Sequence, residues 1–369
     1  MRSVIHHKLR DVVDHFQIEG LYLGAIPCGS GHINDTYVSS FEVGKNEIHY
    51  IHQWINHNIF KEPEKLMKNI ERVTCYARDQ VIAKGGNPAR ESLTLIPTNA
   101  GEWFYKTPDG DYWRTYIFID GARTYDKVEN LQHVYSASKA FGKFQKMLCD
   151  LPGERLHETI PNFHHTRKRF DDFTRSLEND PVNRAQFVEE DIKFILRHEG
   201  ETSLIVDMLG EGVIPERITH NDTKLNNVMI DDKTGEGICV IDLDTVMPGS
   251  ALYDFGDSVR IGASTASEDE IDLSKVDLDL DLYERLTRGY LDATRDFLTP
   301  IEVNLMAFSG KLITLEQSIR FLNDYLNGDK YYRIHYPDHN LVRARTQMKM
   351  VIAMEEKFNQ MITIVDRYK

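Results

Sequence analysis

Several features are missing from this sequence of 369 residues, and each absence argues against a class of protein. Its four cysteines (Cys28, Cys75, Cys149 and Cys239) are scattered and form no Cys-x-x-Cys pair, which disfavours a disulfide-stapled fold and indicates a reducing compartment. No apolar stretch approaches the roughly 18 residues that cross a bilayer, and the charged N-terminal pattern lacks a signal-peptide core. We therefore expect a cytoplasmic protein that does not contact membranes.

The chain also has no excess of positive charge, because its 58 acidic residues outnumber its 44 lysines and arginines. The net charge is −14 and no basic patch stands out, which disfavours nucleic-acid binding. ATP is not excluded, because Mg²⁺ and local groups can meet its phosphates. The chain is longer than one typical domain core requires, which predicts two lobes or domains. Composition does not indicate an oligomeric state.

The most informative feature that is present is a run from His220 to Asn227, followed by an apolar strand that ends at Asp242. It reads H-x-D-x-x-x-x-N and then an aspartate, which is the spacing of a kinase catalytic loop. Transfer of a phosphoryl group from ATP needs a carboxylate that accepts the proton of the acceptor hydroxyl, and Asp222 would supply it. Mg²⁺ needs oxygen ligands nearby, and Asn227 and Asp242 would supply those.

The alternative is a simple turn in which Asp222 caps a backbone amide. The step to Asn227 and the apolar residues before Asp242 favour the catalytic loop. Further on, Asp254-Phe255-Gly256 spells the metal-binding D-F-G motif of protein kinases, but it lies too far downstream, after a turn predicted at Pro248-Gly249. We predict instead that Asp254 braces the catalytic loop or caps the helix that follows it.

The remaining pattern predicts an α+β, two-lobed protein-kinase-like fold with an antiparallel-sheet N-lobe and a mainly helical C-lobe. We expect the nucleotide-binding N-lobe and its leading helix at 1–120, and the C-lobe with the catalytic loop and acceptor site at 121–369. The expected elements are a helix over about 4–18, a hairpin at 22–43, a strand at 47–54, a helix from Pro63 to Gly85-Gly86, strands at 92–97 and 112–120, and a catalytic hairpin at 217–248.

The strings THNDTKLNNVMID and VIDLDTVMPGSALYDFGDSVRIGAS resemble the aminoglycoside phosphotransferase-like kinases, and within them the N-acetylhexosamine 1-kinase branch. The early loop Gly29–Asn34 and the C-terminal segments Arg320–Leu322 and Tyr336–Arg343 are similar to the same family, so the resemblance spans nearly the whole chain. It implies ATP- and Mg²⁺-dependent phosphorylation of the anomeric hydroxyl of N-acetylglucosamine or N-acetylgalactosamine.

The resemblance also implies roles for residues that spacing alone does not single out. Asp244 would assist a second metal ion, and His32, Arg320 and Tyr331 would contact the sugar together with Asp222. Each contact residue has a simpler alternative. His32 would then cap a turn, Arg320 would form a surface ion pair on its amphipathic helix, and Tyr331 would pack in the core.

The nucleotide side departs from protein kinases. Their third strand carries a lysine that binds the α- and β-phosphates, whereas this chain has Gln53 at the equivalent place. A glutamine can donate a hydrogen bond to a phosphate but cannot neutralise it, so the usual ion pair to the next helix, here through Glu71, is in doubt. We expect Mg²⁺ and the loop of Gly29, Ser30 and Gly31 to bind more of the phosphate charge.

Taken together, the sequence favours a kinase of a small N-acetylated sugar. A kinase of the same fold that acts on another small alcohol (an aminoglycoside, choline, homoserine or another hexose) is the nearest alternative. A non-catalytic nucleotide-binding regulator is disfavoured, because the predicted base and both predicted metal ligands are present.

Overall fold

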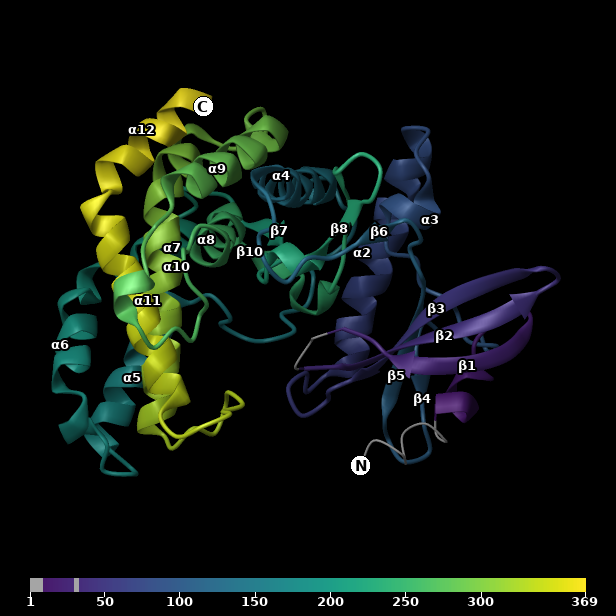
Figure 1. The fold of residues 1–369 in the computed structure, drawn as a ribbon, viewed down its shortest axis with the longest axis horizontal. Coiled ribbons are helices and arrows are strands. Elements are labelled where there is room, and N and C mark those ends of the chain that lie inside the picture. Colours follow the sequence, from purple (N-terminus) through teal and green to yellow (C-terminus); the bar gives the residue numbers. More distant parts are fainter. Residues whose placement is uncertain (1–8, 30–32) are drawn as a thin grey trace.

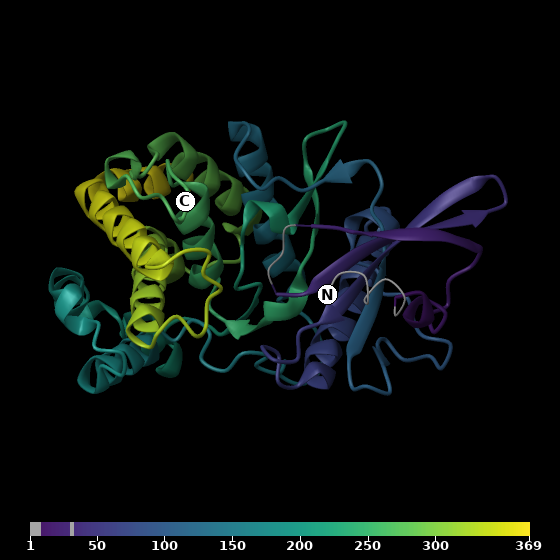
Figure 2. The same cartoon turned by 60° about the horizontal axis from the view of Figure 1, so that its bottom comes forward.

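The computed structural model describes residues 9–29 and 33–369 and has two lobes of different architecture (Figure 1). We call the part built on the sheet, up to residue 117, the sheet lobe, and the part made mainly of helices, from residue 131 onward, the helical lobe. The two lie next to each other along the longest axis of the molecule, and Figure 2 shows the same division from a second direction. The predicted α+β, two-lobed fold is confirmed.

The sheet lobe is an antiparallel sheet in the order β1-β2-β3-β5-β4. Its elements are β1 (Leu21–Pro27), β2 (Asp35–Val43), β3 (Asn46–Ile55), α2 (Pro63–Ala83), α3 (Pro88–Glu91), β4 (Tyr105–Lys106) and β5 (Tyr112–Ile117). In β2, Tyr37, Ser39 and Phe41 are buried while the residues between them are more exposed, because successive side chains point to opposite faces. The buried face packs on the helical turn at residues 9–13.

Two expectations for this lobe are wrong in part. The helix predicted over 4–18 covers only 9–13 of the described residues, since Phe16 instead pairs with Thr98 in an isolated bridge; residues 4–8 lie outside the described part.

The segment 92–97 is not a regular strand, because only Leu95 bridges to β5, at Tyr116. β4 occupies the same edge of β5, and Pro97 has no amide to extend the pairing.

The helical lobe packs its helices around two small ribbons, β6-β8-β9 and β7-β10, which lie between the helices and the sheet lobe in Figure 1. Its helices are α4 (Leu131–Leu148), α5 (Thr166–Asn179), α6 (Glu189–Arg197), α7 (Leu204–Gly210), α8 (Ala251–Gly262), α9 (Leu280–Thr294), α10 (Pro300–Leu326), α11 (His339–Glu356) and α12 (Phe358–Tyr368). Its strands are β7 (Arg217–Thr219), β8 (Val228–Asp231), β9 (Gly237–Val240) and β10 (Met247–Gly249). β6 (Ala122–Arg123), in the segment that joins the two lobes, pairs with β8.

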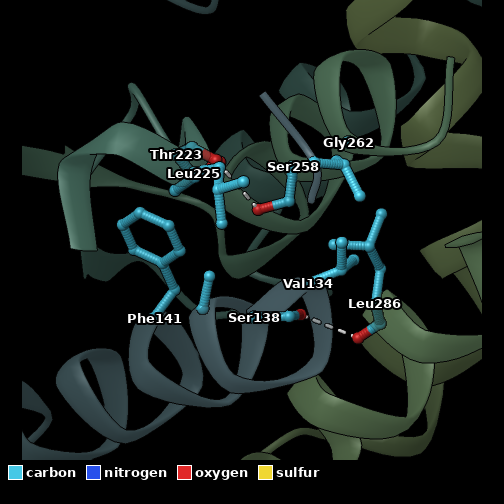
Figure 3. Close-up of a pocket in the computed structure, with 10 residues that line it drawn as sticks. Val134, Ser138, Phe141, Thr223, Leu225, Ser258, Gly262 and Leu286 are labelled. Carbon is cyan, nitrogen blue, oxygen red and sulfur yellow. Dashed lines mark hydrogen bonds between the residues drawn. The ribbon is translucent and has the colours of Figure 1, made fainter. Parts of the chain in front are cut away.

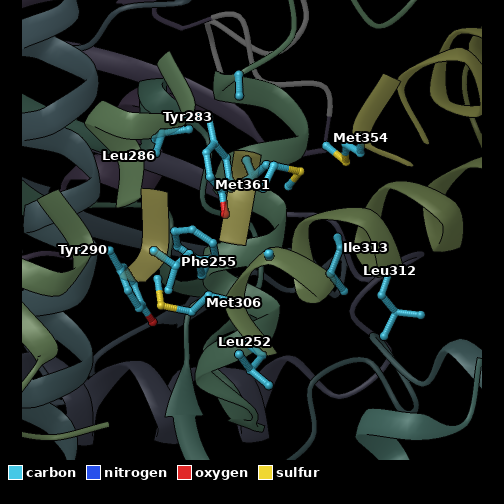
Figure 4. Close-up of a cluster of buried hydrophobic side chains, with 14 of the residues drawn as sticks. Leu252, Phe255, Tyr283, Leu286, Tyr290, Met306, Leu312, Ile313, Met354 and Met361 are labelled. Carbon is cyan, nitrogen blue, oxygen red and sulfur yellow. The ribbon is translucent and has the colours of Figure 1, made fainter. Parts of the chain in front are cut away.

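The long helix α10 organises this lobe. It begins with Pro300 at its first position, after a reciprocal capping box in which Thr299 and Glu302 satisfy each other's backbone amides. Side chains of α8, α9, α10, α11 and α12 meet in one buried cluster, part of which Figure 4 shows around Phe255, Tyr283 and Met306. Among the helices in the described part of the chain, none combines the length and apolar character needed to cross a membrane.

Candidate active site

The predicted catalytic loop joins β7 to β8, in the middle of the molecule. His220 is completely buried and packs against the rings of Phe141 and Phe144 on α4. Its Nε2 donates to the carbonyl of Ile241 (2.9 Å), which leaves Nδ1 to accept the amide of Asp222 (3.3 Å). This neutral imidazole therefore links the loop residue Asp222 to the end of the strand that carries Asp242.

Asp254 braces the same loop, as predicted. Its Oδ2 accepts the amide of His220 (2.9 Å) and its Oδ1 accepts the amide of Asn221 (2.6 Å). Asn221 has a left-handed backbone (φ 66°), which an asparagine tolerates better than most residues. Asp257, one turn further along α8, accepts the amide of Thr223 (2.9 Å). The N-terminal half of α8 thus fixes the loop through its backbone.

The whole Asp254-Phe255-Gly256 triplet has a structural explanation. Phe255 is fully buried in the helical core. Gly256 lets α8 approach α10 closely, since a Cβ there would lie 2.6 Å from the carbonyl oxygen of Ser309. One expectation here was wrong: Pro248-Gly249 belongs to the short strand β10, which pairs only with β7, so the missing amide of Pro248 is tolerated.

A buried ion pair supports the loop from the other side. His164 bonds through Nδ1 to Glu316 on α10 (2.8 Å) and through Nε2 to the carbonyl of Asn221 (3.1 Å). Both partners are acceptors, so both nitrogens donate and the ring is an imidazolium. Burial alone would lower the pKa of His164, but the Glu316 carboxylate raises it above 6.5, and Asp257 adds to this. The sequence pattern does not single out His164, because nothing in Phe163-His164-His165 points to so distant a partner.

Asp222 projects into partly open space, with its side chain 25% exposed. Lys224 lies beside it, with Nζ 2.8 Å from Oδ1. Burial would raise the pKa of Asp222, but the charges of Lys224 and Arg260 hold it below its ordinary value. An ionised carboxylate with access to solvent can accept a proton at neutral pH. Lys224 is not among the predicted site residues, although its position two residues after Asp222 indicates that it lies near the base.

Asn227 and Asp242 are brought to the same place. Asn227 donates from Nδ2 to the carbonyl of Asp222 (2.8 Å) and to its carboxylate (3.2 Å), which leaves the amide oxygen as a ligand atom. Asp242 has a left-handed backbone (φ 58°) and is exposed as a residue, and its carboxylate accepts no hydrogen bond from the described residues. The protein around the carboxylate shields it in part from water, and this shielding, with the charges of Asp244 and Asp222, raises its pKa to about 6. Crowded carboxylates beside an amide oxygen are a donor set that suits Mg²⁺.

Asp244 is oriented differently. Its side chain is 4% exposed, and both oxygens are bound by the sheet lobe, one by Arg114 and the other by Asn34 (2.5 Å). Gln53 is likewise engaged, since it accepts from Arg114 (3.0 Å) and donates to Thr36 (3.1 Å).

Of the predicted glycine loop, Gly29 has a positive φ of 83°, which favours glycine. Ser30, Gly31 and His32 lie outside the described residues.

The predicted sugar contacts Arg320 and Tyr331 meet in a cavity of about 260 Å³, which we call the α5–α10 cavity. It is lined by Arg169, Asp172, Arg320, Asn323, Asp324, Asn327, Lys330, Tyr331 and Tyr332. Asp222 is not among these residues. The link to the catalytic loop runs through α10, where Glu316, the partner of His164, lies about one helical turn before Arg320.

The charges in the α5–α10 cavity are unbalanced. Asp172 is bound to Lys168 and Arg175, and Asp324 accepts the amides of residues 330–332 at 2.8 to 2.9 Å. By contrast, Arg169, Arg320 and Lys330 form no ion pair with any carboxylate of residues 9–29 or 33–369.

The guanidinium groups of Arg169 and Arg320 also interact unfavourably. Burial and the nearby Arg320 lower the pKa of Arg169. Arg320 lies over the rings of Phe163 and Tyr332, at 5.1 and 5.8 Å, so the expected alternative of a surface ion pair is wrong. Tyr331 is 59% exposed, so the alternative of core packing is wrong for it too.

A second, apolar cavity lies behind the catalytic loop, between α4, α8 and α9 (Figure 3). Its volume of about 20 Å³ is too small for a sugar. Thr223 and Leu225 pack over it, and Ser138 at its floor donates to the carbonyl of Leu286 (2.7 Å). This small cavity is part of the packing that supports the catalytic loop.

An antiparallel-sheet lobe beside a helical lobe that carries a loop of catalytic spacing is the arrangement typical of phosphotransferases of the kinase type. The comparison with known families agrees. The chain belongs to the phosphotransferase enzyme family, whose sequence pattern matches residues 94–293, more than half of its length.

Three solved structures illustrate the likeness of fold. One is an aminoglycoside phosphotransferase from Alicyclobacillus acidocaldarius, with a TM-score of 0.61 and 10% identity, covering 97% of this chain and 95% of that chain. The second is a choline kinase from Cryptosporidium parvum Iowa II, with a TM-score of 0.59 and 16% identity, covering 100% of this chain and 99% of that chain. The third is an amicoumacin kinase in complex with AMP-PNP and Ca²⁺, with a TM-score of 0.57 and 14% identity, covering 97% of this chain and 93% of that chain. At these identities the likeness concerns the fold alone.

Proposed function

We propose that the protein transfers the terminal phosphate of ATP to the anomeric hydroxyl of N-acetylglucosamine or N-acetylgalactosamine, in the cytoplasm. The single observation that carries the choice of acceptor is the charge of the α5–α10 cavity. Its Arg169, Arg320 and Lys330 lack carboxylate partners among the described residues. A cationic alcohol such as choline would be repelled there, whereas the hydroxyl and acetamido oxygens of a neutral sugar are acceptors for these donors.

In this proposal Asp222 is the base. Its carboxylate, kept ionised by the neighbouring charge of Lys224, accepts the proton of the anomeric hydroxyl as that oxygen attacks the terminal phosphorus. His220, Asp254 and Asp257 hold the loop so that the carboxylate keeps one position. Fixed placement of this kind is a large part of phosphoryl-transfer catalysis.

The ligands proposed for Mg²⁺ are Asp242 and the amide oxygen of Asn227, with phosphate oxygens completing its shell. When bound, Mg²⁺ would offset the charge on the phosphates. Gln53 and the loop of Gly29, Ser30 and Gly31 would lie against the nucleotide. The side chains of His32, Arg320 and Tyr331 would contact the sugar. We also propose that the boundary between the two lobes lies near residue 120.

The experiment is a coupled assay of ADP release across free sugars and small alcohols, with Asp222→Asn as the inactive control. We expect both N-acetylhexosamines to be the best acceptors and glucose and galactose to be poorer. Activity on choline or an aminoglycoside alone would contradict the proposed acceptor and favour a kinase of another small alcohol.

A further inference from the structure

The sheet lobe contains a buried guanidinium near the expected phosphate site. Arg114 lies on β5 directly opposite Gln53 of β3, and its side chain is fully buried. Gln53 occupies the position where protein kinases carry their phosphate-binding lysine. The positive charge that is missing from β3 is therefore present on the strand beside it.

Arg114 is held by several contacts. Its Nε donates to Gln53 (3.0 Å), its Nη1 forms an ion pair with Asp244, and the guanidinium carbon lies 5.4 Å from the centre of the Tyr116 ring. Burial would lower the pKa of Arg114, but the Asp244 carboxylate raises it above its ordinary value. The group is a permanent cation.

One atom of this group has no partner. Within residues 9–29 and 33–369, Nη2 of Arg114 meets no hydrogen-bond acceptor, although it is shielded from solvent. A buried donor without an acceptor is unfavourable. Arginine forms its strongest hydrogen bonds with carboxylate and phosphate oxygens. An anionic oxygen from a bound molecule would complete this site.

Asp244 connects this cation to the helical lobe. Its Oδ1 is bound by Arg114 and its Oδ2 by Asn34, the residue that follows the glycine loop and that also accepts the amide of Asn56 (3.0 Å). Two residues earlier, Asp242 is exposed. The two carboxylates of one turn thus face different partners. The expected kinase partner, Glu71 on α2, instead accepts from the indole of Trp103 (2.7 Å).

We propose that Arg114 and Asp244 take the place of the strand-three lysine and its helix glutamate. Arg114 binds the nucleotide phosphates from Nη2, and Asp244 is a positioning residue that anchors Arg114 and fixes the turn carrying Asp242, not a second metal ligand. The inference rests on the proposed function in one respect, because it takes ATP as the phosphate donor.

The test measures binding of AMP-PNP by calorimetry, with and without Mg²⁺, so it does not depend on turnover. Arg114→Met should weaken AMP-PNP binding by roughly tenfold or more, as expected for the loss of a charge-assisted hydrogen bond. Adding Gln53→Lys to this variant should restore part of the affinity, because it moves the charge to the strand-three position. Unchanged affinity in Arg114→Met, or no recovery in the double variant, would overturn the proposal.

Arg114→Lys covers the case in which the methionine variant does not fold. Lysine keeps the charge but cannot bind Gln53, Asp244 and a phosphate with one planar group, so AMP-PNP affinity should fall by about threefold or more. Unchanged affinity would again count against the proposal. Arg217→Met is the matched control: it removes a mostly buried arginine (side chain 12% exposed) that is paired with Glu302 (2.7 Å), and it should lower the melting temperature without changing nucleotide affinity.

Asp244→Asn separates the two roles of that residue. As a positioning residue it acts through Arg114, so the double variant with Arg114→Met should bind AMP-PNP no more weakly than the weaker single variant. The Mg²⁺ concentration needed for half-maximal binding should stay the same. A shifted Mg²⁺ requirement with independent, additive losses would instead make Asp244 a metal ligand. A wild type that binds AMP-PNP but phosphorylates no sugar would contradict the acceptor proposal while leaving this result intact.

Discussion

The catalytic loop and the α5–α10 cavity lie in the same lobe but are held in different ways. In the loop, Asp254 and Asp257 of α8 accept hydrogen bonds from the backbone amides of residues 220, 221 and 223. The buried imidazolium of His164 donates to the backbone carbonyl of Asn221. In the cavity, partly exposed cations lack carboxylate partners among the described residues, and Tyr331 is mostly exposed.

The difference follows from what each region does. A reacting carboxylate must keep one position, and the backbone of its loop is therefore held by hydrogen bonds from within the protein. A specificity pocket gains from donors that only the correct ligand satisfies, because an unpaired buried donor or acceptor costs about 1–3 kcal/mol. Substitutions in the two regions should therefore change different measured quantities.

The largest expected effect contrasts two aspartates near the loop. Asp242→Ala should lower turnover by roughly 10³-fold or more and weaken Mg²⁺-dependent nucleotide binding, because it removes the proposed anionic metal ligand. Asp254→Ala should instead lower the free energy of unfolding by about 3 kcal/mol, since it leaves the buried amides of His220 and Asn221 without an acceptor. Mg²⁺ titrations and urea unfolding of both variants would check this. A Mg²⁺ dependence governed by Asp254 would reverse the assignment.

Asp222→Asn should lower turnover nearly as much as Asp242→Ala, but it should leave nucleotide binding almost unchanged. It keeps the shape of the side chain and removes the proton acceptor, so kcat should fall by about 10²–10⁴-fold. The affinity for ATP, measured by calorimetry, should change little. Near-normal turnover in this variant would remove Asp222 from its proposed role.

In the cavity the effect should be smaller and confined to the acceptor. Arg320→Ala should raise the KM for the sugar by roughly tenfold, at about 1.4 kcal/mol per decade, with the KM for ATP little changed. Asp324→Asn should act in the same direction, because its carboxylate accepts the amides of Lys330 and Tyr331 and so shapes the cavity wall. Steady-state kinetics with each substrate varied would decide, and an equal rise in both KM values would contradict a separate acceptor site.

The smallest effect concerns pH and the His164–Glu316 pair. The pKa of His164 is raised in the folded state, so its contribution to stability is fully present below pH 6.5 and is lost as pH rises through the raised value. The pKa of Glu316 is lowered, so its contribution is present above 4.5 and is lost as pH falls.

The stability difference between wild type and His164→Gln should therefore be largest between pH 4.5 and 6.5 and should shrink at higher pH. Each unit of pKa elevation corresponds to about 1.4 kcal/mol. Urea unfolding at several pH values would measure it. A stability difference that does not vary with pH would mean that the His164 imidazole is not charged.

The sequence predicted what depends on short spacing. The catalytic loop, Asn227, Asp242 and the bracing role of Asp254 could be proposed because a local pattern fixes their relative positions. The partners of Asp254 confirm its role, whereas the catalytic and metal roles stay predictions.

Contacts between distant segments could not be found in this way. Arg114 and Asp244 are 130 residues apart, and His164 and Glu316 are 152 apart. Only strand pairing and helix packing bring them together, and a single arginine or histidine carries no mark of such a partner. The irregular structure of residues 92–97 could not be predicted from the sequence either. It depends on β4, which pairs with the other part of the same edge of β5.

The most direct test of the account is the identity of the product. The enzyme, ATP, Mg²⁺ and N-acetylglucosamine would be incubated together, and phosphorus-coupled NMR would locate the transferred phosphate. The account predicts a phosphate on the anomeric oxygen, with no such product from the Asp222→Asn variant. Phosphate on the 6-hydroxyl, or transfer to choline or an aminoglycoside but to no sugar, would contradict it.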